Sequence, residues 1–422
     1  PVETSMPSLS DKLKSLGVKV GASDLPKPKP RKTSYSIEQV LAGHVWQSHQ
    51  GETFVVEESY PADFHQGQMG IQLTAPRHVI ADWAGDERVK NFPASSFAFI
   101  DTETTGLSGG AGTYAFLIGV GRFDGEDFHL AQFFMRDPVE EAAQLAALEE
   151  FMAPCDALVT FNGKSFDIPL LHTRFITHGW RPPFKNSAHV DLLHLARRLW
   201  SERLASRTLG NLEVQILGAS RTEEDVPGWM IPSLYFQYLR SGDARPLKSV
   251  FYHNAMDVVS MAALFNHMAG ILAEPLNGAV EHAVDIVSMA RLFESLGDYP
   301  SAIRLYLYGL EQNLPKQILL DAIQRLALIY KRAGDYAPAI ELWQQAAHHQ
   351  DLDSYIELAK YYEHRQKDYE TALQWTQLAI ELINSASFSA FERRQQLPEL
   401  EHRRDRLLRK LSANPKRGDD II

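Results

Sequence analysis

Four acidic residues have the types and positions needed for metal-dependent chemistry: Asp101, Glu103, Asp167 and Asp257. Asp101 and Glu103 follow the apolar run at 97–100, which is typical of a buried strand, and residues two apart on a strand face the same side. Asp167 comes after a second apolar strand at 157–161, where a helix over 166–177 is expected. Asp257 lies on a predicted helix over 257–271, whose apolar residues recur at three and four positions.

These local contexts would deliver all four carboxylates to one shared place. Gathered carboxylates cannot all stay ionised unless a cation offsets their mutual repulsion. Hard oxygen ligands, with a single cysteine in the whole chain, favour Mg²⁺ or Mn²⁺. The simpler alternative is that these acids cap helices or end strands.

The segments around the four acids resemble a known superfamily. The motifs are D-T-E-T-T-G-L at 101–107, F-N-G-K-S-F-D at 161–167 and a late aspartate with His253 one turn before it. They look like the three motifs of the DEDD class of 3′-to-5′ exonucleases, which have a ribonuclease H-like fold. A closer likeness is to the YprB-like branch, on the segments 107–117, 189–200 and 225–228 and on His253-Asn254. The resemblance covers roughly residues 9–272, and the order and spacing of the motifs make it specific.

The resemblance implies hydrolysis of phosphodiester bonds in DNA or RNA with two metal ions, Mg²⁺ or Mn²⁺. Asp101 is expected to bridge the ions, and Glu103, Asp167 and Asp257 to complete the two coordination spheres. Two alternatives stay open. The same ions would support structure-specific endonuclease action in a groove open at both ends, and the domain could also be a non-catalytic adaptor.

The general base departs from the known subclasses, which place a tyrosine four residues or a histidine five residues before the last aspartate. Here His253 is four and Tyr252 is five residues before Asp257. On a helix, the four-residue spacing puts His253 on the face of Asp257 and rotates Tyr252 away. An imidazole of near-neutral pKa also suits proton abstraction better than a phenol. We therefore expect His253 to be the base; the alternative is a structural histidine beside metal-activated water.

Further residues are candidates for substrate contacts: Thr104, Asn162, Lys164, Arg197 and Arg198. The formal net charge of −11 is unusual for a nucleic-acid enzyme, but nine basic and four acidic residues lie between 161 and 222. Arg203 and Arg207 in this stretch are also candidates for phosphate contacts, or they are solvated or ion-paired. Asp191 is expected to cap a helix rather than to be a fifth metal ligand.

The single cysteine, Cys155, excludes an internal disulfide and a cysteine-rich zinc site. No apolar run in the sequence is long enough to cross a bilayer, and residues 1–21 lack the hydrophobic segment of a secretory signal. These features predict a soluble, cytoplasmic protein with no membrane partner.

The predicted organisation is a mixed α/β domain followed by an all-α domain. Residues 1–33 form a short helix and a Pro/Lys linker, and 34–92 extend the core domain. Residues 93–272 form a ribonuclease H-like α/β domain with a mixed five-stranded sheet flanked by helices. Residues 223–250 are an insertion that could be a lid or a wall of the substrate site. A linker at 273–280 precedes helical repeats at 281–385 and a charged helix and tail at 386–422.

The C-terminal half has an internal repeat. Gly-Asp-Tyr at 297–299 and at 334–336 and Lys-Asp-Tyr at 367–369 are each followed by an alanine three residues later: Ala302, Ala339 and Ala372. The pattern resembles the tetratricopeptide repeat, a helical hairpin of about 34 residues. Three stacked units leave a concave face. We expect this face to bind a protein partner, or the array to stabilise or self-associate the enzyme.

Overall fold

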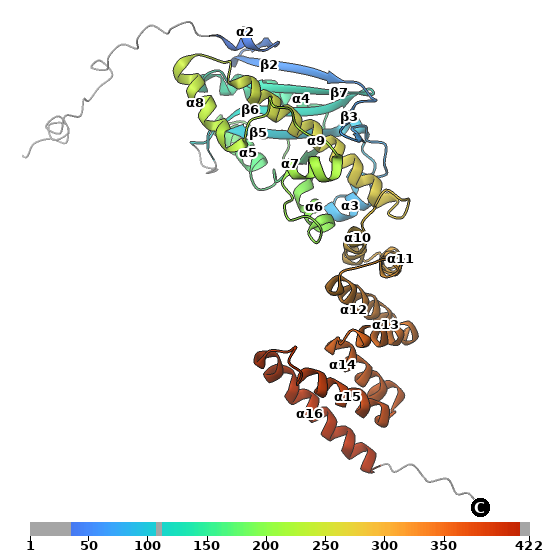
Figure 1. Cartoon of the computed structure of the whole chain (residues 1–422). Coiled ribbons are helices and arrows are strands. Elements are labelled where there is room, and N and C mark those ends of the chain that lie inside the picture. Colours follow the sequence, from blue (N-terminus) through green and yellow to red (C-terminus); the bar gives the residue numbers. More distant parts are fainter. Residues whose placement is uncertain (1–34, 107–111, 414–422) are drawn as a thin grey trace, which may run out of the picture.

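The computed structural model describes residues 35–106 and 112–413, as a sheet domain followed by a column of helices (Figure 1). The predicted N-terminal helix and the Pro/Lys linker therefore lie outside the described residues. The sheet has seven strands in the order β1-β2-β7-β6-β5-β8-β9. Their bounds are β1 His44–Ser48, β2 Gly51–Tyr60, β5 Phe97–Thr104, β6 Ala115–Asp124, β7 Asp127–Phe134, β8 Ala157–Thr160 and β9 Ala188–Asp191.

The predicted mixed sheet is confirmed, with two strands more than the five expected. Strands β5, β6 and β7 form an antiparallel meander, and β8 and β9 add to the edge of β5 in parallel. The extra strands, β1 and β2, come from the predicted N-terminal extension. Strand β2 pairs antiparallel with β7 along its length from Phe54 to Tyr60, so residues 34–92 contribute to the sheet itself.

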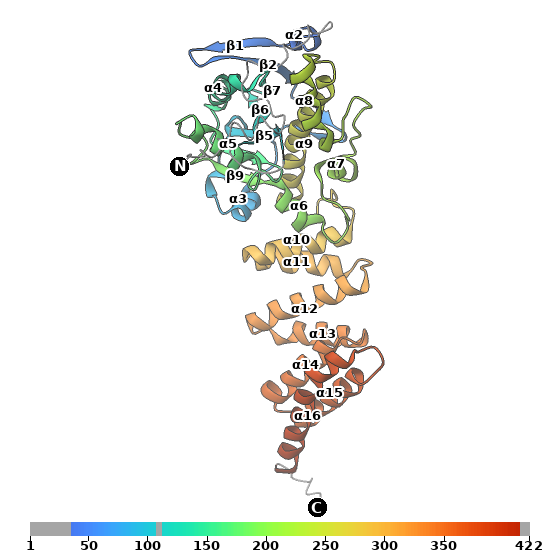
Figure 2. The same cartoon turned by 90° about the vertical axis from the view of Figure 1, so that its left-hand side faces the viewer.

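Helices cover both faces of the sheet, and successive residues of β5 pack alternately against the helices on the two faces. Phe97 and Phe99 pack with α9, Leu247–Ala273, and with α6, Leu192–Trp200. Ala98 and Ile100 pack on the opposite face with α4, Glu141–Met152, and α5, Asp167–Thr177. Figure 2 shows β5 between α5 and α9. Side chains further along β5 must therefore point alternately toward α9 and toward α5.

Shorter elements complete this domain. They are α2 Ile37–Val40, the hairpin β3 His65–Gln66 and β4 Met69–Gly70, α3 His78–Ala84, α7 Leu209–Leu212 and α8 Ile231–Ser241, with single turns η2 Glu87–Lys90, η3 Ala94–Ser96, η4 Pro138–Glu140, η5 Glu213–Leu217 and η6 Gly228–Met230. The segment predicted as a lid or wall, 223–250, supplies η6, α8 and the start of α9. Its Tyr235 is fully buried and stacks on Phe116, with ring centroids 4.0 Å apart, so α8 is part of the packed domain.

Helix α9 is the one helix in the described ranges that is long and apolar enough to cross a membrane by length and composition, a feature that the sequence analysis missed. Most of that apolar window, 72%, is buried inside the protein. Its apolar residues include Val258 and Phe265, which pack against the phenylalanines of β5. These contacts are those of a helix in the core of the domain.

The C-terminal region is all-helical, as the repeat prediction requires. Three hairpins follow one another: α10 Ala283–Leu296 with α11 Tyr299–Leu310, α12 Lys316–Ala333 with α13 Tyr336–His348, and α14 Leu352–Tyr361, extended by η7 Tyr362–Gln366, with α15 Tyr369–Ile383. The last helix, α16 Ala390–Ala413, packs against α15 and ends the column (Figure 1).

The repeated tripeptide builds the turn of each hairpin. Gly297 and Gly334 end the first helices with φ of 80°, a left-handed conformation in which glycine has no Cβ penalty, and Lys367 takes the same role with φ of 56°. The aspartate that follows precedes the second helix, and the side chains of Asp298 and Asp368 accept hydrogen bonds from its first turn. The recurring sequence pattern therefore has a direct physical cause.

Candidate active site

Strand β5 aims its two acids at helix α9. Asp101 and Glu103 face the same side of β5 as Phe97 and Phe99. Thr102 faces the other side, with Ala98 and Ile100. The Oδ2 of Asp101 accepts a hydrogen bond of 2.8 Å from the Nδ2 of Asn254 on α9. The pair predicted from the two-residue spacing thus shares one face of the strand.

Asn254 is fixed by its own contacts. It is fully buried, and its Oδ1 accepts a 2.9 Å hydrogen bond from Gln132 on β7. The side chain fits because β6 has Gly119 opposite Asp101; a Cβ there would lie only 2.2 Å from the Oδ1 of Asn254. Asn254 therefore holds the Asp101 carboxylate in one orientation.

Asp167 reaches the site from the opposite face of the sheet. It is the first residue of α5, and its carboxylate accepts a hydrogen bond from the hydroxyl of Thr102. The loop before it is held by Asp191, which accepts hydrogen bonds from the backbone N–H of Asn162 at 2.8 Å and of Lys164 at 3.0 Å. The hydrogen bonds to Asp191 therefore hold the loop before Asp167 in place.

The position of Asp191 confirms its predicted role as a helix cap. Its side chain accepts from the backbone N–H of Leu193 at 3.1 Å, in the first turn of α6, and the residue is fully buried. With three backbone donors, both of its oxygens are occupied by structural hydrogen bonds.

His253 and Asp257 lie on the same face of α9, which begins six residues before His253. The Nε2 of His253 is 3.7 Å from the Oδ2 of Asp257, and its Nδ1 is 2.7 Å from the Oδ1 of Asp225. An ionised carboxylate can only accept, so Nδ1 carries a proton and donates it to Asp225. The Arg221 guanidinium, 3.1 Å from the same nitrogen, cannot accept that proton. This arrangement turns Nε2 toward Asp257.

Tyr252 is turned away from this face, as its spacing predicts. Its hydroxyl accepts a 3.2 Å hydrogen bond from the backbone N–H of Thr222. The phenol therefore supports the loop before Asp225 instead of the carboxylate site.

Sequence reasoning missed a buried ion pair beside the site. The guanidinium of Arg221 donates two hydrogen bonds to Glu213, of 2.7 and 2.6 Å, and a third to Asp257. Glu213 is 1% exposed. In the sequence these two residues are only one acid and one base eight positions apart, and no periodicity marks them.

The carboxylates are close enough to perturb one another. Partial burial, together with the negative charges of Asp257, Glu103 and Asp167, raises the pKa of Asp101 well above its ordinary value. Burial and the negative charges of Asp257 and Asp167 raise the pKa of Glu103 to about 8, and burial raises that of Asp167 to about 6. Burial also raises the pKa of Asp257, against the opposing charge of Arg221. The structure therefore brings the four predicted acids into one electrostatic unit that favours added positive charge.

The chemistry of this donor set fits a hard divalent cation. Among residues 35–106 and 112–413, no three or more His, Cys, Asp or Glu side chains are already grouped around one point. Thr102, Arg221 and Asn254 each hold one of the carboxylates by a hydrogen bond.

Two hollows flank the acids. One, of about 440 Å³, is lined by Leu209, Gly210, Glu213, Val214, Arg221, Asp225, His253 and Asp257. The other, of about 320 Å³, is lined by Thr102, Thr104, Gly106, Thr113, Ser165, Phe166, Asp167, Pro169 and Leu170. Asp257 thus lines the first hollow and Asp167 the second, while Asp101 and Glu103 line neither hollow.

The remaining predicted contacts are placed unevenly. Thr104 lines the second hollow, Asn162 takes a positive φ of 70° in the loop before α5, and Lys164 is exposed on that loop. Arg197 and Arg198 are exposed on α6. Their contacts with substrate stay predictions.

Arg203 was expected as a candidate phosphate contact, and the structure gives it another role. Its Nε donates a 2.8 Å hydrogen bond to Asp285 of α10, which is 4% exposed. Arg207 donates to the backbone carbonyls of Leu204 and Ala205. Arg203 is therefore an ion-pair partner that ties the sheet domain to the first repeat.

Comparison with known proteins agrees with this geometry. A family model of the RNase H superfamily matches residues 98–269 of the chain. The chain is also 34% identical over 292 residues to the uncharacterized protein YprB of Bacillus subtilis (strain 168); the match covers 68% of this chain and 69% of that protein. The chain thus belongs to the RNase H superfamily and, within it, to the family of YprB. The predicted likeness to a ribonuclease H-like domain of the YprB-like branch is confirmed, and membership indicates a nuclease-type function with a nucleic-acid substrate.

Proposed function

We propose that this protein is a metal-dependent nuclease that hydrolyses phosphodiester bonds of DNA or RNA as a 3′-to-5′ exonuclease. The observation that carries the proposal is the convergence of Asp101, Glu103, Asp167 and Asp257, whose raised pKa values indicate a shared need for positive charge. Three elements that are remote in sequence, β5, α5 and α9, supply these residues. Acids that only capped helices or ended strands would have no need to converge.

The four carboxylates would hold two ions of Mg²⁺ or Mn²⁺, with Asp101 as the shared ligand. When bound, such ions supply an activated water and stabilise charge on the phosphate and the departing oxygen. The protein orients the ligands: Asn254 holds Asp101, and Arg221 holds one oxygen of Asp257. Nucleases of this superfamily generally use divalent metal ions.

His253 would act as general base. With Nδ1 bonded to Asp225, the lone pair of Nε2 is free to accept a proton from the attacking water. The water oxygen forms a bond to phosphorus, the bond from phosphorus to the 3′ oxygen breaks, and that oxygen leaves with a proton. Asp225 would be the positioning residue that fixes the tautomer of His253, in the same way as carboxylates orient catalytic histidines elsewhere.

Two observations favour alternatives within the same fold. The two hollows beside the acids would also accommodate a strand that continues past the site, which is the requirement for endonuclease action. The repeat column has a groove of its own, as expected for a non-catalytic adaptor or for an enzyme that docks to a partner.

A substrate blocked at one end tests the polarity. The full-length protein is incubated with Mn²⁺ and 5′-labelled single-stranded and duplex DNA and RNA, each with a free or a phosphorothioate-blocked 3′ end. The proposal predicts a ladder that starts at the 3′ end and disappears when that end is blocked. Discrete internal products from blocked substrates would instead show an endonuclease, and intact substrates throughout would favour the adaptor.

A further inference from the structure

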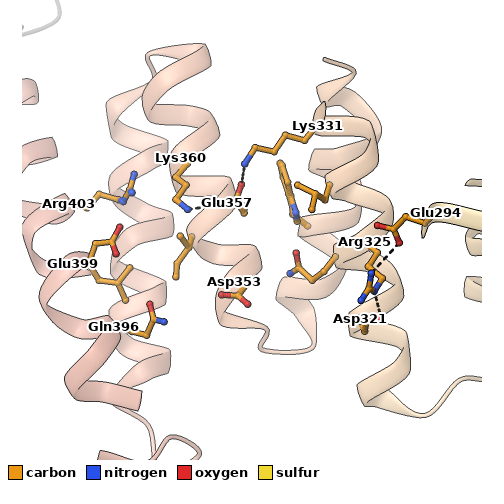
Figure 3. A pocket seen from close by; sticks show the side chains of 15 residues that line it. Glu294, Asp321, Arg325, Lys331, Asp353, Glu357, Lys360, Gln396, Glu399 and Arg403 are labelled. Atoms are coloured by element: carbon orange, nitrogen blue, oxygen red, sulfur yellow. Dashed lines mark hydrogen bonds and ion pairs between the residues drawn. The ribbon is translucent and has the colours of Figure 1, made fainter. Parts of the chain in front are cut away.

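The helical column contains a groove that is separate from the carboxylate site. It has a volume of about 500 Å³ and crosses the first helices of successive hairpins, α10, α12 and α14, and the final helix α16 (Figure 3). Its apolar surface comes from Leu328, which is 37% exposed, and from the half-buried Ile356, and the buried Trp343 and Leu400 lie beneath them. Charged side chains surround these residues.

Every cation that lines the groove already has a carboxylate partner. Arg325 pairs with Asp321 at 2.9 Å and with Glu294 at 3.3 Å. Lys331 and Lys360 both pair with Glu357, and Arg403 pairs with Glu363 behind the groove at 2.8 Å. Little positive charge is therefore left to attract an acidic ligand.

Two carboxylates that line the groove differ from the paired cations. In the part of the chain that the structure describes, Asp353 on α14 and Glu399 on α16 make no hydrogen bond and no ion pair, and both line the groove (Figure 3). Partial burial and the negative charges of Asp351 and Glu357 raise the pKa of Asp353. A ligand that fits this groove must bring cations to these two acids and lay apolar atoms on the floor.

The chain itself contains a segment of this chemistry. Residues 27–32 read Lys-Pro-Lys-Pro-Arg-Lys, with four cations in six residues of a chain whose net charge is −11. Alternating prolines favour an extended polyproline conformation, which loses little conformational entropy on binding. The long aliphatic stems of lysine and arginine can also cover apolar surface while their charged ends reach carboxylates.

The segment cannot reach the groove of its own molecule. The carbonyl of Tyr35 bonds the backbone N–H of Ala244, next to the start of α9, and the repeats begin beyond the other end of α9. Helix α9 has 27 residues and at 1.5 Å per residue is about 40 Å long. The eight residues from Lys27 to Tyr35 span at most about 28 Å. Figures 1 and 2 show α2 on the side of the sheet domain that faces away from the helical column.

We propose that the groove formed by α10, α12, α14 and α16 binds the basic segment 27–32 of a second copy of this chain, with its cations on Asp353 and Glu399 and its prolines on the apolar floor. The contact is heterologous, head to tail, so each molecule offers one segment and one groove. This interaction is independent of the nuclease reaction.

The binding step is tested by isothermal titration calorimetry with a synthetic peptide of residues 24–35 and the full-length protein that carries glutamine at 27, 29, 31 and 32, so that its own segment does not compete. One peptide should bind per groove, and 0.5 M salt should weaken the binding. The charge-reversed variant Asp353→Lys/Glu399→Lys should lose at least about tenfold in affinity. The isosteric Asp353→Asn/Glu399→Gln should lose affinity without the risk of disturbing the fold, which circular dichroism checks. Glu401→Lys, at an exposed position outside the groove, is the matched control.

A mixing experiment separates a second copy from other occupants. In sedimentation velocity, the wild-type chain should associate with rising concentration. The groove variant, and a segment variant with glutamine at 27, 29, 31 and 32, should each remain monomeric. Mixed together, they should form a one-to-one dimer, because one still supplies the segment and the other the groove. Equal peptide affinity in the charge-reversed variant, or no dimer in the mixture, would overturn the proposal.

Discussion

Glu363 joins the last helix to the repeats, and its removal should loosen α16 by a predictable amount. Its side chain is fully buried and takes ion pairs from three cations of α16: Arg403 at 2.8 Å, Arg406 at 2.8 Å and Lys410 at 2.9 Å. Hydrogen bonds and charges from Arg406 and Lys410 outweigh burial and lower the pKa of Glu363 from 4.5 to about 2. The ionised carboxylate therefore stabilises the folded state.

The pKa gives the magnitude. A decrease from 4.5 to about 2 corresponds to about 3 kcal/mol of stabilisation at neutral pH. Arg406 and Lys410 are 34% and 36% exposed, so solvent screening reduces this, and we expect Glu363→Gln to cost about 2 kcal/mol. Because the folded pKa lies below the unfolded one, the contribution is complete above pH 4.5 and is lost as the pH falls toward 2.

Hydrogen exchange measured by mass spectrometry on the full chain is the suitable assay, because α16 can open without global unfolding. At pH 7, peptides from α16 in Glu363→Gln should exchange about 30-fold faster than in the wild type, and peptides from the sheet domain should not change. Glu381→Gln, at an exposed position on α15, is the control. The difference in unfolding midpoint between Glu363→Gln and wild type should shrink between pH 4.5 and 2. Unchanged α16 protection in Glu363→Gln would refute the reasoning.

Three further outcomes follow from the site. Asp225→Asn should lower kcat about 10- to 100-fold with little change in KM, because His253 loses the acceptor that fixes its tautomer; steady-state kinetics with kcat within twofold of wild type would contradict this. Gly119→Ala should displace Asn254 and lower both cleavage and, by about 1–3 kcal/mol, stability; crystallography of the variant would show whether the asparagine moves. Arg221→Gln should lower the free energy of unfolding by about 3–5 kcal/mol and Tm by about 10 °C, because it leaves the buried carboxylate of Glu213 unpaired. In thermal melts, the double variant Arg221→Gln/Glu213→Leu should recover much of this loss.

Features that depend on short-range periodicity could be predicted from the sequence. The two-residue spacing of Asp101 and Glu103 and the four-residue spacing of His253 and Asp257 each imply a shared face, and the structure has both. The repeated tripeptide is also a local signal. Its first residue ends one helix in a left-handed conformation, and the aspartate that follows caps the next helix.

Features that depend on pairing between remote segments could not be predicted. The register of β2 against β7 joins residues that are 68 to 80 positions apart, from Tyr60 with Phe128 to Phe54 with Phe134, and no local pattern sets it. Arg221 looked like one of nine cations near the site, and only the fold brings it between Glu213 and Asp257. Arg203 is ion-paired, which is one of the two alternatives that the sequence left open, but its partner could not be named because Asp285 belongs to the next domain.

The central claim is that the four converging carboxylates hold the metal ions that cleave a phosphodiester. The most direct test compares wild type and Asp101→Asn for Mn²⁺ binding by calorimetry and for cleavage of a 5′-labelled oligonucleotide with Mn²⁺ or EDTA. The wild type should bind Mn²⁺ and cleave only with it, and Asp101→Asn, although folded, should lose at least one bound ion and about a thousandfold or more of the rate. Undiminished Mn²⁺ binding and cleavage in Asp101→Asn would contradict it.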